Sequence, residues 1–565
     1  MNLWEEERAT HKSFRPVTTF LWRILADVVG HVSPLYSRFL SCVGHTVACL
    51  VLLRIARHSL FSRVPTVWRF VVCMLFAAHP VHVENIVYCV GFADSLSTIF
   101  LGLAFLGAVS STNRLAVCCL CTLSALSKES GFVSYLLVFS VDFLRFPKFP
   151  RRYLPQLLVA VAAPLLRFWY VGGSPVNFAY VDVPYIYERS AFVRGLSYLH
   201  AHSVYARLSV FPWNMSWDYS FDAVPLVRSV LDLRMLGSLA TYSGVSAIFW
   251  SAFKNFDLLH VLTVGMFILP FVPASSLFIA VGTVVGERLL YPVTFGLALL
   301  LIVSEFSKII KVGFYIILPV YCVLAYQRVS VWSSKFSLYS TDAVAWPRSC
   351  KTLHQYGAML LNSDKESALA VLERSLEIFD DNALTDYLIS QIFIEKKDFI
   401  AAIGVHNKIA NGHGIGFTDF SRFMFLVDAG YVLIASGDIS QYPVNLIEEG
   451  LEIYGWVLHA RNALGVAYLH LSRLEEAIDH LEFASHICVV DRRLSSTNCE
   501  IVYSNLAVAY AVHGDRATAG NALQEALALA EAGNRSAQEV TQHNYKWFLG
   551  ETEYPRTEIF YERFT

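Results

Sequence analysis

Ionisable side chains stand at the ends of several apolar segments of this chain. A charged group beside hydrocarbon requires a partner or a function to offset the cost of its desolvation. Carboxylates at such positions can accept protons, and an arginine offers paired donors that suit a phosphate. The candidate residues are His79, His82, Glu84, Asp94, Lys128, Glu129, Glu287 and Arg288. Their types favour a binding site for a phosphate at the edge of a membrane.

Each group also has an alternative interpretation. The HPVHVE stretch has the residue types of a metal site, but Pro80 fixes a turn and no further ligand set is evident. A hydrogen-bonded loop or a substrate site is therefore favoured, and no metal is predicted. Lys128 and Glu129 lie between two apolar helices and could simply pair with groups on other helices. Glu287 and Arg288 could form one ion pair at a helix end, but an arginine beside apolar helices is well suited to a phosphate, which we favour.

The composition is that of a polytopic membrane protein. Of the 565 residues, 55% are hydrophobic and only 16% are charged, whereas charged residues make up about a quarter of an ordinary soluble protein. The net charge of −2 provides no basic field, and no nucleic-acid motif is present. Membrane lipid is therefore an expected partner, and nucleic acid is not.

Apolar runs alternate with short loops over the first 327 residues. The predicted membrane spans lie at about 38–53, 66–80, 86–108, 115–127, 131–144, 153–169, 235–252, 257–274, 291–304 and 312–326. Lys and Arg gather in every second connecting loop, which the positive-inside rule places in the cytosol. The candidate residues, the aromatic-rich segment 170–234 and the C-terminal tail then share the opposite side. N-glycosylation sequons at Asn214 and Asn534 fall on that side.

The last third of the chain has the periodicity of water-soluble helical hairpins. The clearest copy is NALGVAYLHLSRLEEAIDHLEFAS, in which small residues such as Gly465 allow two helices to approach closely. This region resembles an array of four or five tetratricopeptide units, although residues 421–455 fit poorly because Pro443 falls inside a would-be helix. Such arrays bind peptides or domain edges and rarely catalyse. Alternatively, the array is only a structural support for the membrane part.

The predicted organisation follows from these patterns. The parts are a lumenal loop remnant (1–37), a multi-span membrane domain (38–327), a linker (328–350), the repeats (351–535) and a C-terminal tail (536–565). If the first basic loop is cytosolic, residues 1–37 lie on the opposite side without a preceding span. We therefore expect this sequence to lack a first transmembrane helix. Cys488 and Cys499 could pair if the tail faces an oxidising compartment, and the sequence leaves that open.

Six motifs in order carry a family resemblance. They are HKSFRPVTTF, HPVHVENIVYCVGFADSLS, LSALSKESG, FPWNMSWDYS with VPLV, PFVPASSLF with VGERLLYP, and the trailing repeats. Together they resemble the transmembrane and tetratricopeptide-containing protein O-mannosyltransferases of the endoplasmic reticulum. The resemblance implies an all-α fold: a helical membrane domain of C-type glycosyltransferase kind followed by an α-solenoid. It also implies transfer of mannose from dolichyl-phosphate-mannose to Ser or Thr of secretory-pathway proteins, chiefly cadherin-like domains, with no cofactor.

Residues carry over from that family one by one. His79, His82 and Glu84 match its His-Pro-x-His-x-Glu stretch, and Asp94 matches the end of its Gly-Arg-Ala-Asp, where Phe92 replaces the arginine. The matches also include Lys128, Glu129, Glu287, Arg288 and, from the first loop, Arg15. We expect these residues to bind the donor or the acceptor.

The catalytic acids are the main departure from the family pattern. The family's paired aspartates lie early in its first lumenal loop, and this sequence begins beyond them. Glu84 is then the best remaining carboxylate and the tentative catalytic residue. The alternative function is a non-catalytic membrane adaptor of the endoplasmic reticulum that binds lumenal clients through its repeats.

Overall fold

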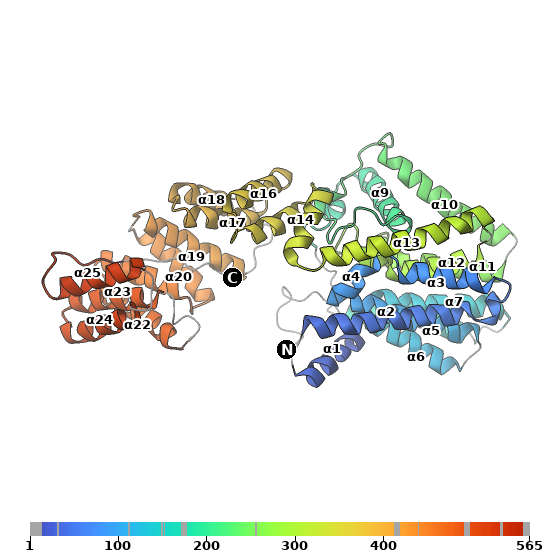
Figure 1. The fold of residues 1–565 in the computed structure, drawn as a ribbon, viewed down its shortest axis with the longest axis horizontal. Helices are drawn as coiled ribbons and strands as arrows, with labels where there is room; N and C mark the ends of the chain where they lie inside the picture. The colour runs from blue at the N-terminus through green and yellow to red at the C-terminus, as the bar shows by residue number, and fades with distance from the viewer. Residues whose placement is uncertain are drawn as a thin grey trace. The chain divides into compact units, whose positions relative to one another are not determined.

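The computed structural model is helical throughout the part of the chain that it describes. The structure describes residues 14–30, 33–110, 113–148, 151, 153–170, 178–254, 257–278, 280–304, 306–411, 419–438, 440–490, 498–530 and 535–557. Within these ranges it contains α-helices and short 3-10 helices and no strand (Figure 1). The predicted all-α class is confirmed. The chain divides into two compact units, Met1–Tyr356 and Gly357–Thr565.

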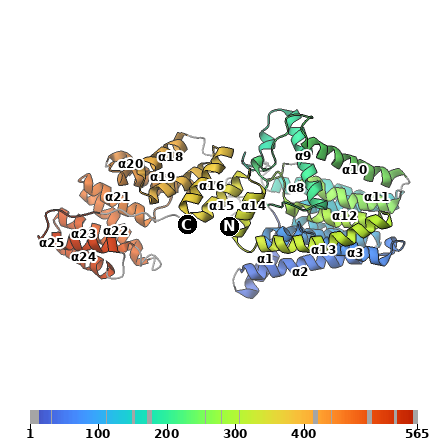
Figure 2. The ribbon, with the colours of Figure 1, turned by 45° about the horizontal axis from the view of Figure 1, so that its top comes forward.

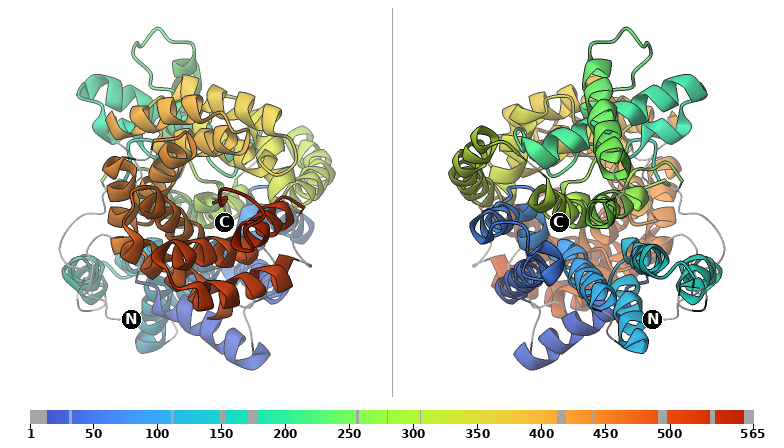
Figure 3. Two further views of the ribbon diagram at one scale, coloured as in Figure 1. Left: turned by 90° about the vertical axis from the view of Figure 1, so that its left-hand side faces the viewer. Right: turned by 90° about the vertical axis from the view of Figure 1, so that its right-hand side faces the viewer.

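A bundle of apolar helices forms most of the first unit. Its members are α2 (Pro34–Ala56), α3 (Thr66–Ala77), α5 (Phe92–Val109), α6 (Arg114–Ser127), α7 (Val133–Arg145), α8 (Leu154–Tyr170), α10 (Arg234–Lys254), α11 (Leu258–Ile268), α12 (Tyr291–Val303) and α13 (Lys308–Val331). The central helix is α5, which packs against α2, α6, α7 and α12. Most of these helices run lengthwise beside one another (Figures 1 and 2), and one view in Figure 3 looks along the bundle. Their buried faces share one hydrophobic core.

Each predicted span overlaps one of these helices, although the span 86–108 also includes the end of α4 and η2, and the span 257–274 also includes η7. Three stretches are long and apolar enough to cross a membrane: Pro34–Ala56, Cys89–Val109 and Lys308–Val331. Shorter apolar helices occupy Thr66–Ala77, Arg114–Ser127, Leu154–Arg167 and Leu258–Ala274. The first unit is therefore of the membrane type that the composition predicts.

Glycines allow the closest approaches inside this bundle. A Cβ atom at Gly296 of α12 would lie 1.9 Å from the backbone oxygen of Met266 in α11. One at Gly131 would lie 2.2 Å from the backbone oxygen of Ser124. Real Cβ atoms do not approach backbone so closely, so only glycine permits these crossings.

Short helices connect the bundle at the end that carries the candidate residues. They are α1 (Pro16–Val29), α4 (His82–Val87), η2 (Cys89–Gly91), η3 (Glu129–Phe132), η7 (Leu269–Ala274) and η8 (Glu287–Leu290), whereas η1 (Ser59–Phe61) connects α2 to α3. Here α4 packs against α2 and η8, and η3 packs against α5, α6 and α7. These contacts bring residues that are far apart in the sequence to one region.

A second, smaller core lies under the segment between α8 and α10. This segment contains η5 (Pro184–Tyr187), α9 (Ala191–Val210) and η6 (Phe221–Ala223). Its core combines buried valines with buried tyrosines, and the Tyr185 hydroxyl donates to the backbone oxygen of Val224 at 2.8 Å. The core also includes Val81, Val285 and Leu290, so the segment packs on the turns around α4 and η8.

The chain continues as helix where the sequence analysis placed a linker. Residues 328–350 contain the end of α13, all of α14 (Lys335–Ala345) and the first residue of α15 (Cys350–Leu360). Arg328 and Asp342 form a buried ion pair at 2.6 Å. The Asp342 carboxylate also accepts a hydrogen bond from the backbone N–H of Trp217 at 2.7 Å. These bonds tie α14 to the segment between α9 and α10.

Consecutive helix pairs make up the second unit, and Figure 2 shows their succession. After α16 (Lys365–Ile378) come the pairs α17 (Ala383–Glu395) with α18 (Phe399–Asn411), α19 (Asp419–Ala435) with α20 (Gln441–Ile453), α21 (Leu458–His470) with α22 (Leu474–Val490), and α23 (Cys499–His513) with α24 (Arg516–Ala530). The last helix, α25 (Arg535–Phe548), packs on α23 and α24. The predicted repeat of paired helices is present.

One expectation about these repeats was wrong. The poor fit of 421–455 rested on Pro443, yet α19 and α20 form a pair like the others. Pro443 is the third residue of α20, in the first turn, where the missing N–H would have no partner within the helix. Gly430 of α19 meets Ile447 of α20, as Gly465 meets Leu481 in the next pair.

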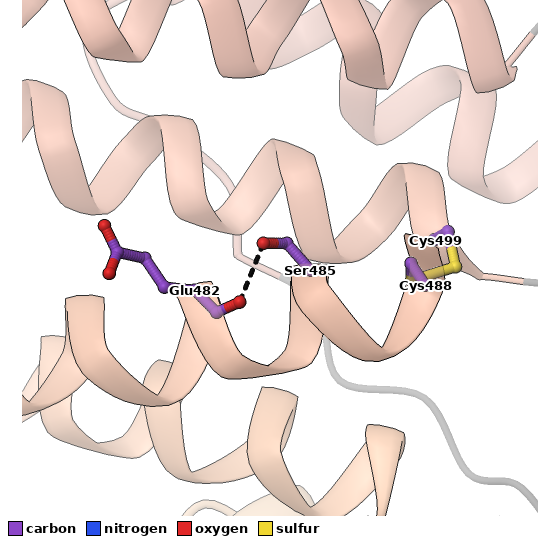
Figure 4. Close-up of a disulfide and its surroundings, with 4 residues drawn as sticks. All are labelled: Glu482, Ser485, Cys488 and Cys499. Carbon is purple, nitrogen blue, oxygen red and sulfur yellow. Dashed lines mark hydrogen bonds between the residues drawn. A yellow bond between two sulfur atoms is a disulfide. The ribbon is translucent and has the colours of Figure 1, made fainter. Parts of the chain in front are cut away.

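Cys488 and Cys499 form a disulfide in this unit. The bond joins the end of α22 to the start of α23, and Figure 4 shows it beside Glu482 and Ser485 of α22. The pairing that the sequence left open is therefore present.

Candidate functional site

Glu84 and Arg288 form the first ion pair of the site. Glu84 lies in α4 and is buried, with its Oε1 2.8 Å from the Arg288 guanidinium. Its Oε2 accepts the backbone N–H of Arg288 at 2.9 Å. The Asn85 amide donates to the backbone oxygen of Arg288 at 3.3 Å. The Glu84 carboxylate therefore fixes both the backbone and the side chain of Arg288, and it raises the pKa of that guanidinium.

A second ion pair, between Asp94 and Lys128, is almost fully buried. Asp94 stands in the first turn of α5, and the Lys128 ammonium contacts its Oδ1. Burial lowers the pKa of Lys128, and the positive charges of Arg288 and Arg15 act in the same direction against the attraction of Asp94. Lys128 is therefore close enough to both arginines for their charges to lower its pKa.

Two arginines converge on Glu129. Arg15, just before α1, donates from its Nε at 2.9 Å, and Arg167 of α8 donates at 2.8 Å. All three side chains are about a quarter exposed. Although burial alone raises the pKa of Glu129, the charge and hydrogen bonds of Arg15 lower it overall. The rings of Phe14 and Tyr170 meet at 5.1 Å beside this group.

Arg167 was missed in the sequence analysis. It lies in the last turn of a helix interpreted as an ordinary span. An arginine at the end of an apolar segment on the side opposite the basic loops was a signal that could have found it.

These three ion-paired groups influence one another electrostatically, because Arg288 and Arg15 act on Lys128 and Asp94 acts on Arg288. Together they carry an excess of positive charge. We call the set Glu84, Asp94, Glu129, Arg15, Lys128, Arg167 and Arg288 the ionic cluster. Four cations oppose three carboxylates, which leaves one positive charge. Nearby, Asn85 Oδ1 and Asp94 Oδ2 are buried without a hydrogen-bond partner in the described structure. The arrangement is suited to an anion with additional polar groups.

The histidines lie outside this cluster and bind other parts of the fold. His79 Nε2 is 3.0 Å from the backbone oxygen of Ser209, and His82 Nε2 is 2.8 Å from the Thr294 hydroxyl. Within the described residues, no group of three His, Cys, Asp or Glu side chains is arranged to hold a metal ion. The two rings connect α4 and its preceding turn to α9 and α12.

Glu287 turns away from its neighbour Arg288. Its Oε1 accepts the Tyr219 hydroxyl at 2.6 Å and the backbone N–H of Ser216 at 2.7 Å, while its Oε2 is buried without a partner. Burial raises the pKa of Glu287 to about 7 despite the charge of Arg328. Glu287 and Arg288 are therefore not paired with each other, and Glu287 joins η8 to the segment between α9 and α10.

The two sequons have different status. Asn214 is exposed, and its backbone oxygen accepts the Trp346 indole N–H at 2.8 Å. Ser216, which completes the sequon, is buried. Asn534 lies outside the described residues, as do His11, Lys12 and Ser13 of the first motif.

The fold and the site define a membrane protein in which an ionic cluster lies at one end of a helical bundle and a helical-repeat unit follows. Residues 172–246, which include the segment with the second core, match the family model described as "Protein O-mannosyl-transferase TMTC, DUF1736". The Caenorhabditis elegans "Protein O-mannosyl-transferase F38B6.6" is 31% identical over 362 residues, which are 62% of this chain and 51% of that protein. The human "Protein O-mannosyl-transferase TMTC4" is 27% identical over 428 residues, or 64% of this chain and 57% of that protein.

These matches confirm the resemblance drawn from the six motifs: the chain is a homologue of the TMTC protein O-mannosyl-transferases. It spans about half the length of the curated relatives that it matches. Among solved structures, the TPR protein YrrB, described as having "an unusual peptide-binding site", covers 37% of this chain and 97% of its own, at 16% identity. The TM-score of this comparison is 0.30.

Proposed function

We propose that this protein transfers mannose from dolichyl-phosphate-mannose to Ser or Thr hydroxyls of secretory-pathway proteins. The observation that carries the proposal is the ionic cluster, which has four cations against three carboxylates. Its excess of one positive charge balances the single negative charge of a phosphodiester. Its cations lie where apolar helices end. A lipid tail between helices and a phosphate at their ends would be bound together by this arrangement.

Arg288 is the cation that we assign to the donor phosphate. During transfer, the acceptor oxygen forms a bond to the anomeric carbon, and the bond from that carbon to the phosphate oxygen breaks. The departing phosphate takes the electron pair, and the proton of the acceptor hydroxyl passes to this phosphate or to water. The Arg288 donors stabilise the additional negative charge on the phosphate. A partly exposed guanidinium held through its backbone and side chain is well suited to this role.

Glu84 acts as a positioning residue in this proposal. Both of its oxygens accept hydrogen bonds from Arg288, so its function is to orient that guanidinium rather than to take the acceptor proton. Asp94 and Glu129 hold Lys128 and the two remaining arginines in the same way. Arg15, Lys128 and Arg167 would then supply the electrostatic surroundings of the donor.

We propose that the candidate residues and the repeats share the lumen of the endoplasmic reticulum. The basic loops on the opposite side support this orientation. The disulfide between Cys488 and Cys499 supports it independently, because disulfides persist in oxidising compartments. Glycosylation at Asn214 and Asn534 is expected there. The resemblance points to cadherin-like domains as acceptors, and the repeat unit could present them.

The proposal is tested by measuring mannose transfer with the full chain in lipid nanodiscs. Radiolabelled dolichyl-phosphate-mannose and a cadherin-like domain are supplied as donor and acceptor. We expect Arg288→Met to lower transfer by about a hundredfold. Arg23→Met, which removes an exposed arginine of α1, is the matched control and should leave transfer unchanged. Equal transfer by the Arg288→Met variant and the unmodified chain would contradict the assignment.

A second candidate, a non-catalytic adaptor, is favoured by the ion pairing of the site's carboxylates. Glu84, Asp94 and Glu129 are each held by a cation, so none is available to take the acceptor proton. Acceptor binding without mannose transfer in the same nanodisc experiment would support this adaptor and overturn the transferase.

A further inference from the structure

An open cavity on the surface of the second unit is a separate candidate binding site. It lies among α22, α23 and α24 and has a volume of about 530 Å³. Volumes of this size are typical of sites for organic ligands and are far larger than a single ion requires. Its lining combines the carboxylates of Glu482 and Glu525, the rings of Tyr503 and Tyr510, and an apolar floor that includes Leu506.

The charge of the cavity is negative. Two glutamates line it, and no lysine, arginine or histidine does. Within the described ranges, neither glutamate forms an ion pair. The Tyr510 hydroxyl donates to Glu482, and burial together with the charge of Glu525 raises the pKa of Tyr503. The cavity therefore combines two carboxylates with aromatic faces, and both attract cations.

The walls of the cavity are connected to one another. The disulfide between Cys488 and Cys499 links α22 to α23, and the bond from Tyr510 to Glu482 links the same helices along their length. Figure 4 shows Glu482, Ser485 and Cys488 along α22, with the Ser485 hydroxyl donating to the backbone oxygen of Glu482. A preorganised site loses less entropy when it binds.

We propose that this cavity binds an extended peptide through one Lys or Arg side chain. The methylene stem of such a side chain would pack on the apolar floor, and its charged head would reach Glu482 and Glu525. The remaining peptide would lie across α23. The inference concerns recognition by the repeat unit and does not depend on mannose transfer, so either can fail alone.

The test is fluorescence anisotropy with the full chain in detergent. The probe is a short fluorescein-labelled Gly/Ser/Thr peptide with one central lysine, and matched peptides carry norleucine or glutamate instead. We expect the lysine peptide to bind roughly tenfold more tightly than the norleucine peptide. The glutamate peptide should bind more weakly still. Equal binding of all three peptides would overturn the proposal.

Variants of the chain locate the binding to this cavity. Glu482→Gln and Glu525→Gln should each weaken binding of the lysine peptide several-fold. Asn521→Lys, which places a cation in the cavity lining, should abolish it. Glu475→Gln removes an equal charge from an exposed position of the same helix, α22, outside the cavity, and should have no effect. If Asn521→Lys and Glu482→Gln bind as tightly as Glu475→Gln, with unchanged circular dichroism, the site assignment is wrong.

Discussion

Glu287→Gln should stabilise the protein at alkaline pH and have little effect at acidic pH. Glu287 is buried, and its Oε1 accepts hydrogen bonds from Tyr219 and Ser216. Glutamine retains an oxygen that can accept both of these bonds. It cannot ionise, so it avoids the cost of a buried charge whose second oxygen has no partner.

The magnitude follows from the pKa. Burial raises the pKa of Glu287 from 4.5 to about 7, a difference equivalent to about 3 kcal/mol. Below pH 4.5 the carboxyl is protonated in both the folded and unfolded states, so it has no effect on stability. As the pH rises toward 7 the unfolded chain releases this proton first, so the folded state loses stability. The full cost of about 3 kcal/mol is present above pH 7.

The assay is the free energy of unfolding in detergent micelles, measured from about pH 5 to about pH 8. We expect the Glu287→Gln variant to be more stable than the unmodified chain by about 3 kcal/mol at the upper limit and by less than about 1 kcal/mol at the lower one. Asp27→Asn, at an exposed position of α1, is the control. A difference independent of pH, or a variant less stable at pH 8, would refute the reasoning.

Three further substitutions test the packing. Arg288→Met leaves the buried Glu84 carboxylate without its cation. Since Arg288 is 31% exposed, we expect the free energy of unfolding to fall by about 2–3 kcal/mol. The double variant with Glu84→Gln should lose less stability than the two single variants together, and additive losses would contradict the pairing. Cys488→Ser removes a disulfide spanning 11 residues and should cost the second unit about 3 kcal/mol in denaturant unfolding, whereas an unchanged midpoint would argue against the bond. Gly296→Ala places a Cβ 1.9 Å from the Met266 backbone oxygen and should destabilise by about 3 kcal/mol or more, so a neutral result in thermal melts would disprove this helix crossing.

Local patterns made most of the fold predictable from the sequence. Apolar runs correspond to the helices of the bundle, and small residues such as Gly465 mark the paired helices of the second unit. The prediction around Pro443 was wrong because a proline is tolerated in the first turn of a helix and excluded from its interior. The sequence analysis did not predict that α20 begins at Gln441. Residues 328–350, which contain the end of α13 and all of α14, were assigned to a linker because they are rich in polar residues. The sequence did not show that two of these residues, Arg328 and Asp342, form a buried ion pair.

The site was predictable as a set of residues but not as a set of contacts. Glu84 and Arg288 are 204 residues apart in the sequence, and neither helical periodicity nor charge pattern specifies such a pair. An ion pair between the neighbours Glu287 and Arg288 was the alternative to a phosphate site, and it is absent because η8 directs successive side chains to different partners. Arg167 was not predicted because it lies in an apolar span. It forms an ion pair with Glu129, as Arg15 does.

The central claim is that the ionic cluster binds the phosphate of a lipid-linked mannose donor. The most direct measurement is equilibrium binding of dolichyl-phosphate-mannose to the full chain in nanodiscs, compared among the unmodified protein, Arg288→Met, Arg167→Met and the control Arg23→Met. We predict saturable binding that is at least about tenfold weaker in the two cluster variants and unchanged in the control. Absent saturable binding, or equal affinity in all four proteins, would contradict the claim.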